Sequence, residues 1–228
     1  MLTNTLPPEA LIFDLDGTLF KTETLSLAAY HMTFDQLRKE GLFTGKTPPE
    51  ERFLQSLGLL LPTIWKNVLP SSSHSTRSRA NTLLLEYQIQ LLTQGHGELY
   101  CGVKKTLKTL FNNGYALFVA SNGLEAYVKG VIQAMELSHL FTALYSAGQF
   151  QTTSKGELVR LLVRNYRLST AWMCGDRLSD VEAGKENGLL VVGCAYGGFH
   201  SKTELQHADL IIDSFPALLA YLPWSSQT

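Results

Sequence analysis

The chain has 228 residues, of which 45% are hydrophobic and 17% are charged, and its formal net charge is -1. This length and composition predict a globular protein with one sizeable domain, or with a core and a smaller insert. The nearly neutral charge argues against a nucleic acid polymer as an electrostatic partner, so we expect small molecules as partners.

The three cysteines, Cys101, Cys174 and Cys194, have no metal-binding spacing and are flanked by apolar residues or glycine. We expect buried thiols in a reducing environment, which predicts a cytoplasmic protein. The longest uncharged run that looks membrane-like, 53–65, contains a glycine and a proline and is too short to span a bilayer, so no membrane partner is expected. A buried helix or an interface is the expected role of this run.

The first predicted element is a strand over residues 11–13, an uncharged run of the kind buried on both faces at the centre of a parallel sheet. It leads into Asp14, Asp16 and Gly17, and the glycine indicates a sharp turn. Two carboxylates this close repel each other unless a metal, a lysine or a shared proton compensates their charge. The pair therefore predicts a functional site, in preference to a helix cap or an exposed turn that carries two acids by chance.

Residues 21–98 do not continue the strand pattern, because they are mostly helical in tendency and are interrupted by prolines. We expect an inserted helical cap there, with a flexible serine-rich loop over residues 71–79. Arg77 and Arg79 in this loop are candidates for sensing substrate, although a solvated loop is the favoured interpretation. The apolar run 57–61 fits either the core of the cap or a dimer surface, so a monomer and a homodimer both stay open.

From residue 103 onward, short apolar runs alternate with helical periods, which is the pattern of repeated βα units around a parallel sheet. The expected strands lie at 115–120, 143–145, 171–175, 189–194 and, at an edge, 210–212. The expected helices begin near Val103, Leu124 and Ser154, and a further short helix ends at residues 187–188. Along the first of these helices, one apolar face is formed by Val103, Leu107, Leu110 and Phe111.

Polar groups follow four of these segments. They are Asp14 with Asp16, Ser121 with Asn122, Lys155 at a helix start, and Asp176 with Asp180. In an open parallel sheet, ligands bind beyond the carboxyl ends of the strands, so we expect these groups to converge. Three or four converging acids need a hard divalent cation, and Mg²⁺ is favoured because no cluster of His or Cys argues for zinc.

This inventory of groups predicts phosphoryl transfer. Lys155 and the hydroxyl of Ser121 can bind phosphoryl oxygens, and one carboxylate can attack phosphorus to form an aspartyl-phosphate. A second carboxylate can protonate the leaving group and later activate water. Taken singly, Ser121 reads as a helix cap, Lys155 as a solvated lysine and Asp180 as a partner of a helix dipole. Only the ordered combination indicates a site.

The combination resembles the haloacid dehalogenase superfamily, in its phosphatase branch with a helical cap, of the phosphoglycolate phosphatase or 5′-nucleotidase type. The resemblance implies an α/β fold with a Rossmann-like parallel-sheet core, formed by residues 1–20 and 99–228. It implies an inserted α-helical cap domain over residues 21–98. It also implies that Asp14 is the nucleophile and Asp16 the general acid and base.

By the same resemblance, the second, third and fourth motifs of the family are matched by Ser121, by Lys155 and by residues 175–180. Mg²⁺ would be held by the acids and one backbone carbonyl, namely the side chains of Asp14, Asp176 and Asp180 and the carbonyl of Asp16. The phosphate would contact Thr18, Ser121, Asn122 and Lys155. The implied reaction is Mg²⁺-dependent hydrolysis of a small phosphorylated metabolite.

Two departures from the family pattern bear on the substrate. Lys21 and Thr22 stand where many relatives carry an acid followed by serine or threonine, and Gly156 replaces a proline that is common after the lysine. Specificity would lie in the cap, where Lys21, Thr22, Arg77 and Arg79 are candidates. A phosphomutase of the β-phosphoglucomutase type stays open, as does a non-catalytic binding protein with the same fold, although the complete set of acids argues against the latter.

Overall fold

The computed structural model describes residues 7–197 and 203–223. Within them, the chain forms an α/β fold on a six-stranded parallel sheet in the order β5-β4-β1-β6-β7-β8. The strands are β1 Ala10–Phe13, β4 Ala116–Ser121, β5 Ala143–Ser146, β6 Ala171–Gly175, β7 Leu190–Cys194 and β8 Leu210–Ile212. The predicted fold class and the predicted strands are confirmed. Since β1 lies between β4 and β6, the order of the strands reverses at β1.

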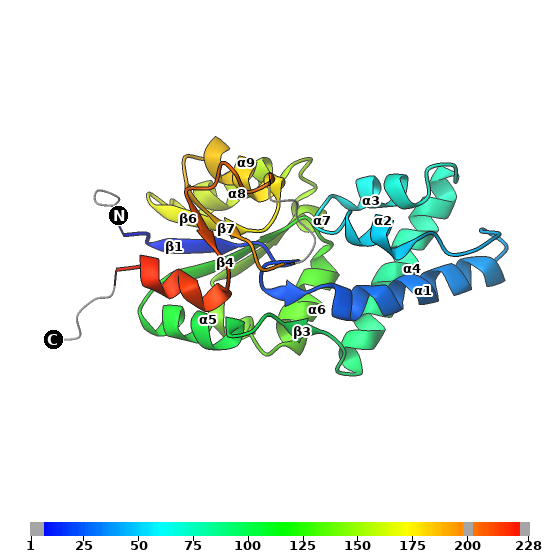
Figure 1. Ribbon diagram of the computed structural model, residues 1–228, viewed down its shortest axis with the longest axis horizontal. Coiled ribbons are helices and arrows are strands. Elements are labelled where there is room, and N and C mark those ends of the chain that lie inside the picture. The colour runs from blue at the N-terminus through cyan, green and yellow to red at the C-terminus, as the bar shows by residue number, and fades with distance from the viewer. Residues whose placement is uncertain (1–6, 198–202, 224–228) are drawn as a thin grey trace.

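The central position of β1 follows from its sequence, because all four of its residues are apolar and fully buried. Leu11 and Phe13 pack into the core with α5 and α6, whereas Ala10 and Ile12 pack with α8 on the opposite face. Figure 1 shows α8 and α9 on one side of the sheet and α5 and α6 on the other. These helices and the short α7 are α5 Val103–Asn112, α6 Glu125–Ala134, α7 Ala147–Phe150, α8 Lys155–Tyr166 and α9 Leu178–Glu186.

Four helices between β1 and β4 lie together at one end of the molecule (Figure 1). They are α1 Glu23–Lys39, α2 Glu50–Leu54, α3 Leu61–Val68 and α4 His74–Thr93. Stacked and edge-on aromatic rings fill the space between them, with Tyr30 against both Phe34 and Phe53. The chain enters and leaves this group, which we call the helical cap, through the antiparallel pair β2 Phe20–Lys21 and β3 Glu98–Leu99.

Two local predictions within the cap are wrong. The serine-rich segment 71–79 is a loop only over 71–73, because Ser73 caps α4 by accepting the N–H of Thr76 at 3.1 Å, and the helix begins at His74. The run 53–65 is not one helix, because Gly58 has a φ of +82° in the turn between α2 and α3.

Two side chains expected inside the protein are exposed. Phe111 is 46% exposed because it lies at the margin of the α5 stripe that Val103, Leu107 and Leu110 bury. Cys101 is also exposed, whereas the other two cysteines are buried as predicted. None of the helices in the described part of the chain combines the length and apolarity that crossing a membrane requires.

Candidate active site at the carboxyl edge of the sheet

The loop after β1 is a tight turn that lies against Asp176, the residue that follows β6. The N–H groups of Leu19 and Phe20 both donate to the carbonyl oxygen of Leu15. Gly17 has a φ of +82°, and a Cβ at this position would lie 2.3 Å from Oδ2 of Asp176. Two constraints therefore favour glycine here, namely the left-handed backbone conformation and the close approach of the Asp176 carboxylate.

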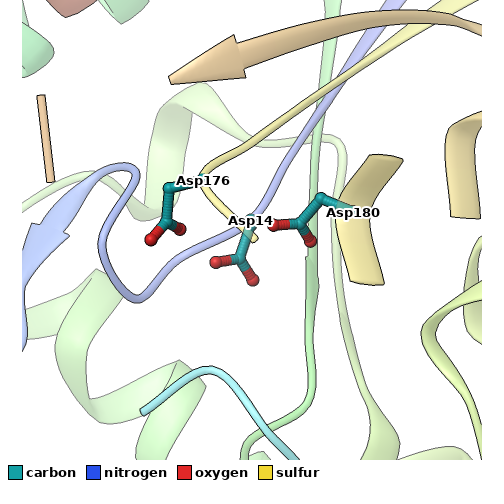
Figure 2. A group of neighbouring side chains, drawn as sticks. All are labelled: Asp14, Asp176 and Asp180. Atoms are coloured by element: carbon teal, nitrogen blue, oxygen red, sulfur yellow. The ribbon is translucent and has the colours of Figure 1, made fainter. Parts of the chain in front are cut away.

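Three buried carboxylates gather beside this turn (Figure 2). Asp14 follows β1, Asp176 follows β6, and Asp180 lies in the first turn of α9. One oxygen from each lies within 4.8 Å of the others, and Oδ2 of Asp14 is buried without a hydrogen-bond partner. A set of oxygen donors with an unpaired buried anion fits a hard divalent cation such as Mg²⁺. The side chain of Asp16 is not part of this group.

Lys155 is the cation that lies among these carboxylates. It is the first residue of α8, which Ser154 caps by accepting the N–H of Glu157 at 3.1 Å. Its Nζ donates to Asp14 and lies 2.9 Å from Oδ1 of Asp180, and the side chain is almost fully buried. One lysine offsets only part of the charge of three acids, so the group keeps a negative charge that a metal ion can neutralise.

The shared burial of these groups changes their protonation. Burial raises the pKa of Asp14 to about 7, with Lys155 opposing the shift and the charges of Asp180 and Asp16 adding to it. Burial and the charges of Asp14 and Asp180 also raise the pKa of Asp176 well above its ordinary value. Burial lowers the pKa of Lys155, but the two neighbouring carboxylates outweigh this effect and raise it. The cluster therefore attracts either protons or a cation.

Asp16 lines a cavity between the sheet edge and the cap. Its Oδ1 accepts hydrogen bonds from the hydroxyl groups of Thr22 and Tyr127, both at 2.6 Å. Burial raises the pKa of Asp16, while these two hydroxyls and the charge of Lys155 oppose the shift. A carboxyl group with a raised pKa at a cavity wall can both deliver and accept a proton.

Tyr127 is the site residue that the sequence analysis missed. It lies in the first turn of α6, and burial together with the charge of Asp16 raises its pKa well above the ordinary value. Its hydroxyl therefore stays protonated and donates to Asp16. Its position in the sequence could have indicated this role, because it follows Ser121 and Asn122 on a helix that starts at the expected sheet edge.

The predicted phosphate ligands are placed differently from one another. Ser121, at the end of β4, accepts an N–H two residues further on at 3.1 Å, which leaves its own O–H available as a donor. Thr18 donates to Oδ1 of Asp176 at 3.1 Å and is fully buried, so it positions that acid. Nδ2 of Asn122 donates to the carbonyl oxygen of Gly58 at 2.8 Å and so ties the core to the cap.

Of the four cap candidates for specificity, Thr22 lines the cavity next to Asp16, whereas the other three line neither that cavity nor a second one beside Lys155. Lys21 pairs with an acid on β3, Arg77 donates to two backbone carbonyls, and Arg79 pairs with Glu40, the residue that follows α1. The apolar run 57–61 lines these two cavities, which fits the prediction that it belongs to the cap.

Comparison with known proteins agrees with this geometry. The chain is 28% identical to the phosphoglycolate phosphatase of Haemophilus influenzae, over 92% of this chain and 96% of that protein. It is 25% identical to the pyrophosphatase PpaX of Listeria monocytogenes, over 82% of each. A solved structure described as a predicted phosphoglycolate phosphatase from Haemophilus somnus has a similar fold, with a TM-score of 0.79, 22% identity, and coverage of 95% of this chain and 99% of that one. Residues 11–194, which are most of the chain, match the model of the haloacid dehalogenase-like hydrolase family, so this chain belongs to that family.

Proposed function

We propose that the protein is a Mg²⁺-dependent phosphatase that hydrolyses a small phosphate monoester through an aspartyl-phosphate on Asp14. One observation carries the proposal: Lys155 holds one oxygen of Asp14, while Oδ2 is buried and has no hydrogen-bond partner. An oriented, desolvated carboxylate oxygen of this kind is suited to attack phosphorus. The names of the phosphatase and pyrophosphatase relatives support the same class of reaction.

The carboxylates of Asp14, Asp176 and Asp180 would hold Mg²⁺, together with the backbone carbonyl of Asp16. When bound, the ion would neutralise charge on the phosphoryl oxygens. Ser121 would add a hydroxyl donor to one of these oxygens.

In the first step, the carboxylate of Asp14 attacks phosphorus, and the bond between phosphorus and the ester oxygen breaks. Asp16, in its protonated form, gives its proton to the departing oxygen, which leaves as an alcohol, and the raised pKa of this carboxyl group favours that form. In the second step, the ionised Asp16 takes a proton from water, and the resulting hydroxide attacks phosphorus. The bond from phosphorus to Asp14 breaks, phosphate is released, and both acids return to their starting states.

The proposal is tested by measuring phosphate release from a panel of small phosphomonoesters, with Mg²⁺ and with EDTA. We expect turnover that depends on Mg²⁺. A folded protein that releases phosphate from no ester of the panel would show that the proposed reaction is wrong.

Mg²⁺ is expected to stabilise the protein against heat. At a hundredfold excess over its Kd, a ligand of the native state adds about 2.7 kcal/mol, or about 5–10 °C in Tm for a chain of this size. The folded pKa of Asp14, about 7, lies above the ordinary carboxyl value. The metal-free protein therefore loses stability as the pH rises from that ordinary value to about 7, because Asp14 must ionise in its buried position. The gain in Tm from Mg²⁺, measured by thermal unfolding, should therefore be larger at pH 7.5 than at pH 5.5. An equal gain at both pH values would contradict this assignment.

Tyr127→Phe is expected to lower kcat about tenfold. Because the hydroxyl stabilises the ionised form of Asp16, its loss should also raise the apparent pKa of Asp16 and move that limb of the pH–rate profile to higher pH. Tyr166→Phe, a partly exposed tyrosine on α8, is the matched control and should change neither value. An unmoved pH profile for Tyr127→Phe would exclude this positioning role.

A further inference from the structure

The cavity that Asp16 lines is the side of the site on which a leaving group must lie. In the proposed reaction, Asp16 protonates the departing oxygen, so the rest of the leaving group has to occupy the space next to this carboxyl group. That space is roofed by the cap, with Phe53, Leu57, Leu59, Leu84 and Leu85 among its walls.

The polar residues of this cavity carry no positive charge. Of the described residues that line it, Asp16 is the only charged one. Two of the neutral polar side chains are already engaged within the cap: Asn81 accepts the indole N–H of Trp65 at 3.2 Å, and Gln88 donates to Ser26 at 2.8 Å. A carboxylate or a second phosphate in the leaving group would therefore be buried beside an acid without a cation, which is costly.

The neighbouring cations within the described part of the chain are held elsewhere. Lys155 is bound between two carboxylates, and Lys21 pairs with Glu98 at 3.1 Å. Arg177 pairs with Glu204 and donates to the carbonyl oxygen of Leu57, so its guanidinium supports the cap turn from the core side.

The cavity is also small. The volume open to water-sized groups is about 50 Å³ with the cap in this position. Small nonpolar groups gain free energy from the leucine-rich walls, whereas hydroxyl-rich groups find few unpaired polar partners there.

We propose that the substrate is a small phosphomonoester whose leaving group is uncharged and mainly apolar, such as a short alkyl or aryl alcohol. This inference rests on the proposed phosphatase activity, since that activity decides which cavity the leaving group occupies. It separates this chain from a phosphatase for phosphoglycolate and from a pyrophosphatase, because glycolate and phosphate are anionic leaving groups.

Binding of non-hydrolysable phosphonates tests the ligand class without requiring turnover. In Mg²⁺, propylphosphonate should bind at least about tenfold more tightly than phosphonoacetate, which has a similar size but ends in a carboxylate. Equal or tighter binding of phosphonoacetate would overturn the inference. In parallel, kcat/KM should be higher for propyl phosphate than for 2-phosphoglycolate. If the binding order holds but no ester is hydrolysed, the phosphatase proposal fails while the ligand class stands.

A substitution in the cavity wall tests the physical cause. Leu85→Arg adds a cation to the lining, so the preference should shift toward phosphonoacetate by about tenfold or more. Leu42→Arg, at an exposed position outside the cavity, is the matched control and should leave the preference unchanged. If the folded Leu85→Arg protein keeps the original ratio, the missing cation does not set the preference. If this variant does not fold, the phosphonate comparison on the unaltered protein decides the matter.

Discussion

Asp14→Asn is expected to lower kcat by at least about 10⁴-fold, because an amide cannot form the covalent phosphoryl intermediate. The free energy of unfolding without metal should change little, by about 1 kcal/mol or less. The reason is that burial already disfavours the ionised form of Asp14, whose pKa is raised to about 7, so a neutral side chain suits this position. Phosphate release under saturating substrate measures the first effect, and urea unfolding in EDTA measures the second.

Asp35→Asn is the matched control for this substitution. Asp35 pairs with Arg38 on the exposed surface of α1, at 2.6 Å, so its loss should leave phosphate release unchanged. An Asp14→Asn protein that is folded and retains more than about one tenth of the parent kcat would rule out Asp14 as the nucleophile.

Lys155→Met is expected to have the largest effect on stability. It leaves Asp14 and Asp180 buried without their shared cation, and breaking such a pair costs about 3–5 kcal/mol. The loss should be greatest in EDTA and smaller in Mg²⁺, because the metal ion replaces part of the missing charge. Activity should fall about 10³-fold, since Lys155 also orients Asp14. Urea unfolding in the two solutions and phosphate release provide the measurements.

Two further variants separate a charge effect from simple loss of a side chain. Lys185→Met removes a lysine that pairs with Asp209 at a partly exposed site, and it should cost less than about 1 kcal/mol. Adding Asp14→Asn to Lys155→Met should restore part of the lost stability, because one of the two uncompensated carboxylates is then neutral. A double variant no more stable than Lys155→Met would contradict the charge explanation.

The sheet edge could be predicted because its signals are local. An uncharged run followed by two acids and a glycine defines the end of β1, and Ser154 marks the start of the helix that carries Lys155. Once the alternation of strands and helices is recognised, the geometry of a parallel sheet brings these residues together whatever the details of packing.

The cap could not be predicted in the same way, because its side chains choose partners far away in the sequence. Gln88 reaches Ser26 across 62 positions, and Arg79 reaches Glu40 across 39. The segment after Ser73 has few strong helix formers, and buried contacts of Thr76 and Ala80 help to hold it in α4. Serine favours both loops and helix caps, so composition alone indicated the wrong alternative.

The antiparallel pair β2 and β3 has a consequence for how such a protein can change over generations. Phe20 lies opposite Leu99 and Lys21 opposite Glu98, so the two ends of the inserted segment are neighbours on the core. The segment between β2 and β3 can become longer or shorter, or be replaced, without moving its two ends. These ends stay as far apart as two paired strands, about 5 Å. The acids of the sheet edge and most of the apolar wall above Asp16 are thus carried by pieces of chain that can be inherited and altered separately.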